Sequence, residues 1–281
     1  MADILTTVHP ELIRIADGRH HDPHSMLWPH DAGVKTVVRT YLPCARSAQL
    51  EGGAALVRLG HSDYFTAEAP AGSLPPHPRI DWTDDRGIRH QRVDPYSFAP
   101  SLSGANLALF GSGGYAEAWR MLGAHPAQFD GVPGVRFAVW APNAERVSVV
   151  GPFCDWDGRR LPMRVLGHSG VWELFVPGLP VGSLYKFEIR NGDSGRVESK
   201  TDPYARAMEL RPATASIVMG DGPYGWSDDE WMDARARRDW LQAPLSIYEV
   251  HVGSWQRHAD GSFLDWRDLT EELIPHVQRL G

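Results

Sequence analysis

The chain has 281 residues, of which 42% are hydrophobic, and its formal net charge at pH 7 is -7. This length predicts about two domains, and the scattered Lys and Arg exclude nucleic acid and anionic membrane as main partners. No run of eighteen apolar residues and no basic-then-apolar leader is present, so we expect a cytoplasmic protein without a membrane partner.

The first predicted element is a short helix. Pro10 suits a first helical turn and Gly18 suits a helix end, and apolar residues such as Leu12 and Ile15 lie between them. The segment from Pro10 to Gly18 therefore predicts a small helix with one apolar side.

Two groups of residues could suggest a metal or redox centre, but neither has the required pattern. Three histidines between residues 20 and 24 surround Asp22, yet adjacent side chains in a turn diverge and no partner cluster has ligand spacing. Cys44 and Cys154 are too few for a disulfide framework. We expect reduced thiols, no metal and no cofactor.

An internal repeat indicates the fold class. Two stretches about a hundred residues apart show the same order: a strand closed by proline, a second such strand, and a glycine seven residues before Asp-Pro-Tyr. The matched pairs are Gly33–Pro43 and Gly134–Pro142, Tyr64–Pro70 and Val171–Pro177, and Asp94–Tyr96 and Asp202–Tyr204. Two copies of one all-β unit with short strands predict two antiparallel sandwiches of immunoglobulin-like type.

Eleven tryptophans are unusual for this length, and most of them must be in cores. Trp140 and Trp172 alternate with apolar neighbours on predicted strands. We therefore expect both side chains to be core residues.

Short helices are expected where the sandwiches end. Tyr115, Trp119 and Leu122 fall on one face of a helix that Gly123 can terminate. Ser227–Glu230 is a capping-box pattern, which predicts a second helix that runs to about residue 238.

The final segment reads as one strand–helix unit. Leu245–Val252 is a nearly continuous β-type run, and residues 265–280 carry apolar side chains at helical spacing, with Pro275 expected to kink or split the helix. A strand that is apolar on both faces belongs to a parallel sheet covered on both sides, and such a sheet needs further units. We therefore expect the start of an incomplete α/β structure.

Several motifs resemble those of glucan-processing enzymes. The glucan-binding sandwich that precedes the catalytic barrel of branching and debranching enzymes is similar to Gly134–Asn143, Gly151–Gly158, Gly170–Phe175 and Tyr185–Ile189. Ile247–Trp255 resembles the first barrel strand and following loop of bacterial glycogen branching enzymes. The extra N-terminal sandwich of those enzymes is similar to Asp22–His24, Asp94–Tyr96 and Leu122–His125.

The resemblance implies the N-terminal part of a 1,4-α-glucan branching enzyme of the α-amylase superfamily. Such enzymes cut an α-1,4 bond with a carboxylate nucleophile and a glutamic acid as general acid/base, and pass the chain to a glucose 6-hydroxyl. Those carboxylates lie on later strands of a barrel that takes about 250 residues. No catalytic residue is therefore assigned, and we expect this chain to be inactive by itself.

The resemblance also implies a glucan-binding site. Trp156, on a turn between strands, corresponds to a tryptophan that stacks on a glucose ring, and Lys186 to a lysine that hydrogen-bonds hydroxyls beside it. The alternative is that Trp156 packs on its own sandwich and Lys186 is merely solvated. Pro152 and Cys154 stand where the family has Asp and Asn, so we expect the loop that presents Trp156 to differ.

The expected fold is mainly β: two tandem immunoglobulin-like β-sandwiches followed by the first β/α unit of an incomplete (β/α)8 barrel. The expected divisions are 1–112 (first sandwich with its leading helix), 113–126 (linker helix), 127–225 (glucan-binding-type sandwich), 226–244 (linker helix) and 245–281 (barrel start).

The expected partner is α-1,4-glucan or glycogen, and the sequence leaves protein partners unknown. Two other functions remain open: a stand-alone glycogen-binding module without catalysis, and a fragment of a debranching or trehalose-releasing enzyme.

Overall fold

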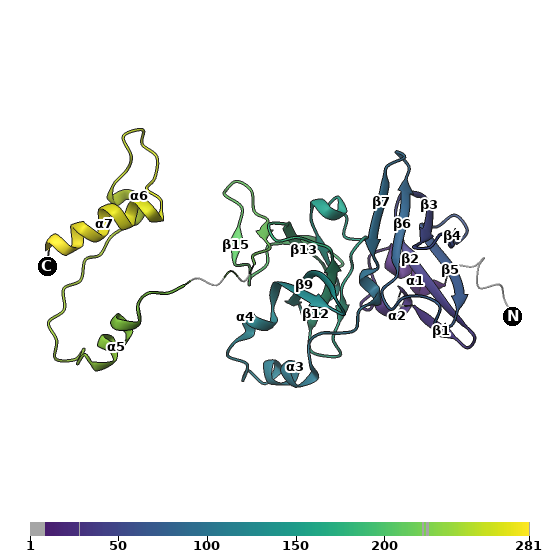
Figure 1. Ribbon diagram of the computed structural model, residues 1–281, viewed down its shortest axis with the longest axis horizontal. Helices are drawn as coiled ribbons and strands as arrows, with labels where there is room; N and C mark the ends of the chain where they lie inside the picture. The colour runs from purple at the N-terminus through teal and green to yellow at the C-terminus, as the bar shows by residue number, and fades with distance from the viewer. Residues whose placement is uncertain (1–8, 28, 221, 223–224, 281) are drawn as a thin grey trace. The chain divides into compact units, whose positions relative to one another are not determined.

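A computed structural model describes residues 9–27, 29–220, 222 and 225–280, and its architecture is mainly β with antiparallel sheets (Figure 1). The chain divides into two compact units, Met1–Gly222 and Pro223–Gly281. The first eight residues of the predicted first sandwich lie outside the described residues. Within the described ranges, no helix combines the length and the apolar character needed to cross a membrane.

The first seven strands form one antiparallel sheet in the order β1-β2-β5-β4-β3-β6-β7. The short strand β4 pairs with β3 on one side and with β5 on the other. Val38 and Phe65 from one half of the sheet share a buried cluster with Leu50 and Ile80 from the other half, so the sheet folds over its own core. The strands are β1 (His30–Ala32), β2 (Lys35–Tyr41), β3 (Ala45–Leu50), β4 (Ala55–Arg58), β5 (Tyr64–Pro70), β6 (Arg79–Asp84) and β7 (Arg89–Val93).

Three short helices precede or follow these strands in the chain. The predicted N-terminal helix is confirmed as α1 (Pro10–Ala16), whose Leu12 and Ile15 are buried and which Gly18 follows with φ 64. The other two are α2 (His24–Leu27) and the 3-10 helix η1 (Pro95–Ser97). Leu12 and Ile15 share a buried cluster with Phe137 and Phe187, so α1 packs against residues that lie more than a hundred positions further along the chain.

Residues 123–217 form two antiparallel sheets. One has the order β11-β12-β9-β8, and the other has the order β10-β13-β16-β15 with β14 paired to β13. Phe137 and Trp172 from the first sheet and Phe187 from the second are buried in one cluster, so the core lies between the sheets and Trp172 is confirmed as a core residue. The strands are β8 (Gly123–Phe129), β9 (Val132–Trp140), β10 (Ala144–Val150), β11 (Arg164–Val165), β12 (Val171–Pro177), β13 (Leu184–Asn191), β14 (Val197–Lys200), β15 (Ala207–Met208) and β16 (Ser216–Ile217).

The internal repeat is confirmed in three dimensions. β2 pairs with β5 and β9 pairs with β12, both antiparallel, so the matched strands of each copy are neighbours. Both Asp-Pro-Tyr motifs form the same turn: Tyr96 N–H donates to Asp94 Oδ1 at 3.1 Å, and Tyr204 N–H donates to Asp202 Oδ1 at 2.7 Å. Both aspartates are buried, so a carboxylate inside the core holds the turn at the end of each copy of the repeat.

One local prediction in this region is confirmed in part and another is wrong. The short helix expected to end at Gly123 is present as α4 (Ala118–Met121), with Leu122 as its C-cap and Gly123 at φ 105. It follows α3 (Gly104–Gly111) and is shorter than the expected linker 113–126, because Gly123–Phe129 pair with β9 as a strand. Trp140, expected in the core, is 54% exposed. It alternates with the core residues Phe137 and Val139, so its side chain lies on the outer face of β9, edge-on to the Phe110 ring.

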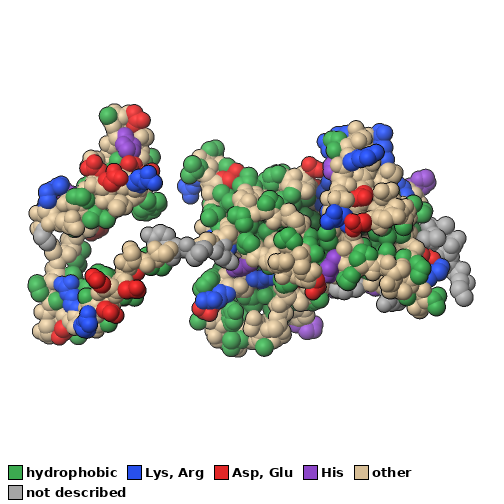
Figure 2. All heavy atoms as spheres, viewed as in Figure 1, with side chains coloured by type: hydrophobic (Ala, Val, Ile, Leu, Met, Phe, Trp, Pro, Cys, Tyr) green, Lys and Arg blue, Asp and Glu red, His purple; other side chains and the backbone are tan. Residues whose placement is uncertain are grey.

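The second unit is helical and carries exposed apolar side chains (Figure 2). Its helices are α5 (Asp229–Arg237), α6 (Val252–Trp255) and α7 (Trp266–Leu280). The two expected helices are present as α5 and α7, and Pro275 does not split α7. The predicted capping box at Ser227 is not formed, since Asp228 is the N-cap and makes no side-chain cap hydrogen bond.

The predicted strand Leu245–Val252 is also wrong. This segment has no regular structure up to α6, and Leu245 and Ile247 are 71% and 82% exposed. A strand needs a neighbour to satisfy its backbone N–H and C=O groups. Within residues 225–280, the described pairing is a single bridge between Arg257 and Phe263, which offers this segment no partner.

Candidate functional site

Trp156 lies on the loop of residues 151–160, which leaves the end of β10. The loop begins with the 3-10 helix η2 (Pro152–Cys154), and Asp155 and Trp156 follow with φ 54 and φ 57. Such left-handed backbone is uncommon for a bulky aromatic residue and persists only where the surroundings hold it. The Trp156 side chain is 41% exposed, so the loop presents much of its indole to solvent.

Arg146 on β10 holds this loop in place. Its Nη1 donates to the carbonyl of Gly158 at 3.1 Å, and its Nη2 contacts Glu188 Oε1 on β13 at 2.6 Å. A Cβ at Gly158 would lie 2.6 Å from Arg146 Nη1 and would overlap Glu188 Oε1, so a larger residue would push these two side-chain ends away. Arg146 Nε also donates to Gly18 after α1, at 3.1 Å. The loop, the second sandwich and the N-terminal helix therefore share one buried guanidinium.

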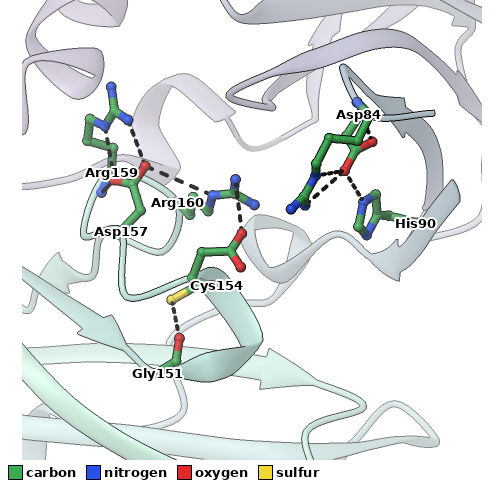
Figure 3. Close-up of polar contacts among 9 residues, drawn as sticks. Asp84, His90, Gly151, Cys154, Asp157, Arg159 and Arg160 are labelled. Atoms are coloured by element: carbon green, nitrogen blue, oxygen red, sulfur yellow. Dashed lines mark hydrogen bonds and ion pairs between the residues drawn. The ribbon is translucent and has the colours of Figure 1, made fainter. Parts of the chain in front are cut away.

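Two ion pairs support the loop from within (Figure 3). Arg159 donates twice to the Asp157 carboxylate, at 2.9 and 2.7 Å, and Arg160 Nη2 lies 3.2 Å from Asp155 Oδ2. Burial alone would raise the pKa of Asp157, but the hydrogen bonds from Arg159 outweigh it and lower this pKa. Asp157 is therefore charged, and an arginine holds each of the two carboxylates beside Trp156.

The departures from the family motif are accommodated by the loop. Cys154 is buried, its Sγ donates to the Gly151 carbonyl at 3.4 Å, and burial raises the pKa of its thiol to about 11. The residue is therefore a neutral core side chain. Pro152 occupies the first position of η2, where the missing N–H costs no helical hydrogen bond.

Lys186 lies across the sheet from the base of the loop. It is on β13, opposite Val150, the last residue of β10 before the loop begins. Its Nζ donates to Thr214 Oγ1 at 2.7 Å. Trp156 and Lys186 thus belong to neighbouring strand ends, although no hydrogen bond joins their side chains in the described part of the chain.

The histidines near the N-terminus make structural contacts. His20 Nε2 lies 3.0 Å from Glu11 Oε2, and His24 is buried with its ring edge-on to Tyr96, at 5.1 Å between centroids. Burial lowers the pKa of His24 well below its ordinary value.

Sequence reasoning missed a cleft beside the Trp156 loop. It encloses about 450 Å³ between the β6–β7 hairpin and residues 152–161. Its walls include Trp82, His90, Phe153 and Asp155. These residues lie about seventy positions apart in the chain, and no sequence pattern connects the two segments.

Comparisons with known proteins match two parts of the first unit to family models. Residues 121–205 match Carbohydrate-binding module 48 (Isoamylase N-terminal domain), and residues 9–96 match the N-terminal domain of the alpha-1,4-glucan branching enzyme GlgB. These matches cover most of the first unit.

Curated relatives align along almost the whole chain. It is 47% identical over 278 residues to the 1,4-alpha-glucan branching enzyme GlgB of Methylococcus capsulatus, covering 99% of this chain and 38% of the relative. It is 51% identical over 271 residues to that of Thiobacillus denitrificans, covering 95% and 36%. Among solved structures, apo pullulanase from Paenibacillus barengoltzii is 24% identical over 54% of this chain and 24% of its own, with a TM-score of 0.34. The chain spans little more than a third of the length of these curated relatives.

Proposed function

We propose, from the premise that this chain corresponds to the N-terminal part of bacterial 1,4-alpha-glucan branching enzymes, that it binds α-1,4-glucan and holds the glucan near such an enzyme's catalytic domain. The single observation that supports this most is the loop of residues 151–160, which presents an exposed Trp156 on a constrained backbone. That loop lies inside the match to a carbohydrate-binding module. The structural cost of a left-handed tryptophan favours a functional reason for keeping it.

The proposed contacts derive from the chemistry of a glucose ring. A pyranose has an apolar C–H face, which an aromatic ring can cover, and hydroxyls at its rim, which need polar partners. Trp156 supplies the flat apolar surface, and Lys186, with Thr214 beside it, supplies the polar group at the same end of the sheet.

We also propose that residues 1–112 and 127–225 are immunoglobulin-like sandwiches and that residues 245–281 begin a catalytic barrel. The motif Ile247–Trp255 and the helix α7 support the barrel assignment. Residues 245–251 have no regular structure here, so we expect the strand to form only when further strands pair with it.

In this proposal the whole enzyme forms α-1,6 branches through a covalent glycosyl intermediate, and the 281-residue chain alone does not. An amylose assay with iodine staining tests the second statement. We expect no loss of stain and no new α-1,6 linkages, and formation of such linkages by the purified chain would refute it.

The alternative of a stand-alone glycogen-binding protein shares the binding site, and the gene downstream of residue 281 separates the two functions. An open reading frame that continues with further strand–helix units would favour the enzyme. The debranching alternative is disfavoured by the match of residues 9–96 to a branching-enzyme domain. A cytoplasmic location stays a prediction from the composition.

Affinity electrophoresis in gels that contain glycogen tests the binding site. We expect glycogen to retard the wild-type protein, and Trp156→Ala to weaken binding by roughly tenfold, which corresponds to about 1.4 kcal/mol. Lys186→Ala should have a smaller effect in the same direction. Trp119→Ala is the matched control, because Trp119 is 54% exposed on α4, outside this loop. Equal retardation of wild type and Trp156→Ala would remove Trp156 from the site.

A further inference from the structure

The cleft beside the Trp156 loop has the size and position of a ligand site. Its volume of about 450 Å³ falls in the range of sites for small ligands. One wall is the β6–β7 hairpin, which belongs to the first sheet, and the other is the loop 152–161 with the end of β12. Asp155 lines the cleft and immediately precedes Trp156, so the backbone of Trp156 is next to the cleft wall.

Several charged groups around the cleft are paired (Figure 3), whereas Nε and Nη2 of Arg92 are buried without a hydrogen-bond partner in the described chain. Asp84 Oδ2 lies 3.1 Å from both Arg86 Nη2 and His90 Nε2, while Arg160 is paired with Asp155. Burial opposes ionisation of Asp84, but the hydrogen bonds from His90, Ile88 N–H and Arg86 keep the pKa of its carboxyl well below the usual range. These ion pairs fix the positions of the Arg86, His90 and Arg160 side chains beside the cleft.

Flat and apolar surfaces complete the wall. Trp82 is half-buried, and its ring stacks on His90 with 5.1 Å between centroids and 16° between planes. The guanidinium of Arg92 lies over the Trp82 ring at 5.4 Å. Phe153 and Leu161 lie on the opposite wall. Apolar surfaces with both hydrogen-bond donors and acceptors at the rim suit a ligand that has C–H faces and many hydroxyls.

We propose that this cleft is a second α-glucan-binding site, which takes one or two glucose units of a chain that also contacts Trp156. The choice of ligand rests on the proposed function, since the aromatic and polar wall suits a sugar and the proposed function specifies α-glucan. Arg86 and Gln91 supply hydrogen-bond donors to the hydroxyls, and Asp155 supplies an acceptor.

Calorimetric titration of the 281-residue protein with maltoheptaose tests the cleft. The variants are Trp82→Leu, which keeps apolar contact with the first sheet, Arg86→Ala, Trp156→Ala, and the double variant Trp82→Leu/Trp156→Ala. Arg86 has a side chain that is 66% exposed, so its truncation leaves the core intact even where Trp82→Leu lowers stability. Trp119→Ala is again the matched control, and thermal unfolding of each variant verifies the fold.

We expect Trp156→Ala to retain weaker binding and the double variant to lose at least about tenfold more. Arg86→Ala alone should weaken binding at least about threefold, the effect of one lost hydrogen bond. If Trp156→Ala abolishes all binding while Trp82→Leu and Arg86→Ala bind like wild type, the cleft proposal is overturned and the Trp156 site stands. If only the cleft variants weaken binding, the cleft stands and the role of Trp156 falls. A wild-type protein that does not bind maltoheptaose overturns both.

Discussion

Arg146 Nη1 donates a hydrogen bond to the carbonyl oxygen of Gly158 at 3.1 Å, and this contact joins the core of the second sandwich to the loop that carries Trp156. The same guanidinium reaches Glu188 and the carbonyl of Gly18. Loop conformation and the packing of the N-terminal helix are therefore coupled through one side chain.

Arg146→Met should destabilise the protein and weaken glycogen binding together. Loss of the guanidinium leaves Glu188 and the Gly158 carbonyl without their partner, so we expect the free energy of unfolding to fall by about 2–4 kcal/mol. Urea unfolding measures the change through the shift in midpoint. Arg146→Lys keeps the positive charge but lacks the several fixed donors of the guanidinium, so its stability should lie between those of wild type and Arg146→Met. An unchanged midpoint for Arg146→Met would contradict the coupling.

Gly158→Ala should disturb the same loop by a steric route. The added Cβ would lie 2.6 Å from Arg146 Nη1 and overlap Glu188 Oε1, so the ion pair has to move apart. We expect a loss of roughly 1–3 kcal/mol, as for overpacking, and reduced retardation by glycogen. Gly104→Ala is the matched control, because nothing lies within 4 Å of its Cβ position at the start of α3. Equal stability of the two variants would show that the loop adapts freely.

Asp94→Asn should change the pH dependence of stability. Burial raises the pKa of Asp94 to about 6, whereas an aspartate in an unfolded chain has a pKa of about 3.9. The folded state therefore holds this proton more tightly, and the contribution to stability is full below about pH 4 and lost as the pH rises through about 6. The variant keeps a neutral side chain, so its stability relative to wild type should rise between pH 4 and pH 7 by roughly 1–3 kcal/mol.

Denaturation midpoints of both proteins across this pH range measure the difference. Burial lowers the pKa values of His20 and His24, which makes stability rise with pH, opposite to the effect of Asp94. This contribution is the same in wild type and variant, so it cancels when the midpoint of one protein is subtracted from that of the other. A difference that does not change with pH would refute the assignment to Asp94.

The two cysteines should differ sharply in reactivity. Burial raises the pKa of Cys154 to about 11, so almost no thiolate is present at pH 8, whereas Cys44 is exposed. A disulfide reagent should modify Cys44 in the native protein and Cys154 only after unfolding in urea. The native Cys44→Ser variant should therefore react only slowly with the reagent. Rapid modification of Cys154 in that variant would mean that the loop of residues 151–160 opens readily.

Limited proteolysis should remove the C-terminal segment before the sandwiches are cut. Residues 239–251 lack regular pairing, and Leu241 and Ile247 are 93% and 82% exposed. Cleavage there should leave a protected fragment of about 240 residues, which mass spectrometry can identify. Full protection of the C-terminus would contradict this description.

Local sequence patterns determined much of the fold. The alternating strands and the two Asp-Pro-Tyr turns predict the repeat, because side-chain alternation and an aspartate bonded to a backbone N–H two residues on are short-range effects. Pro10 and Gly18 likewise define α1 from a few neighbouring positions. The resemblance of the motifs to branching enzymes was also visible in the sequence, and the comparisons bear it out.

Tertiary structure decided the features that depend on partners far along the chain. The run Leu245–Val252 has the composition of a strand but no neighbour to bond, and Trp140 has apolar neighbours but lies on the outer face of β9. The hydrogen bond from Arg146 to Gly18, and the cleft between Trp82 and Phe153, arise only when the N-terminal residues and the first sheet pack against residues 123–217. The physical reason is that periodicity specifies which residues are apolar or extended, whereas backbone pairing and burial depend on what packs against them.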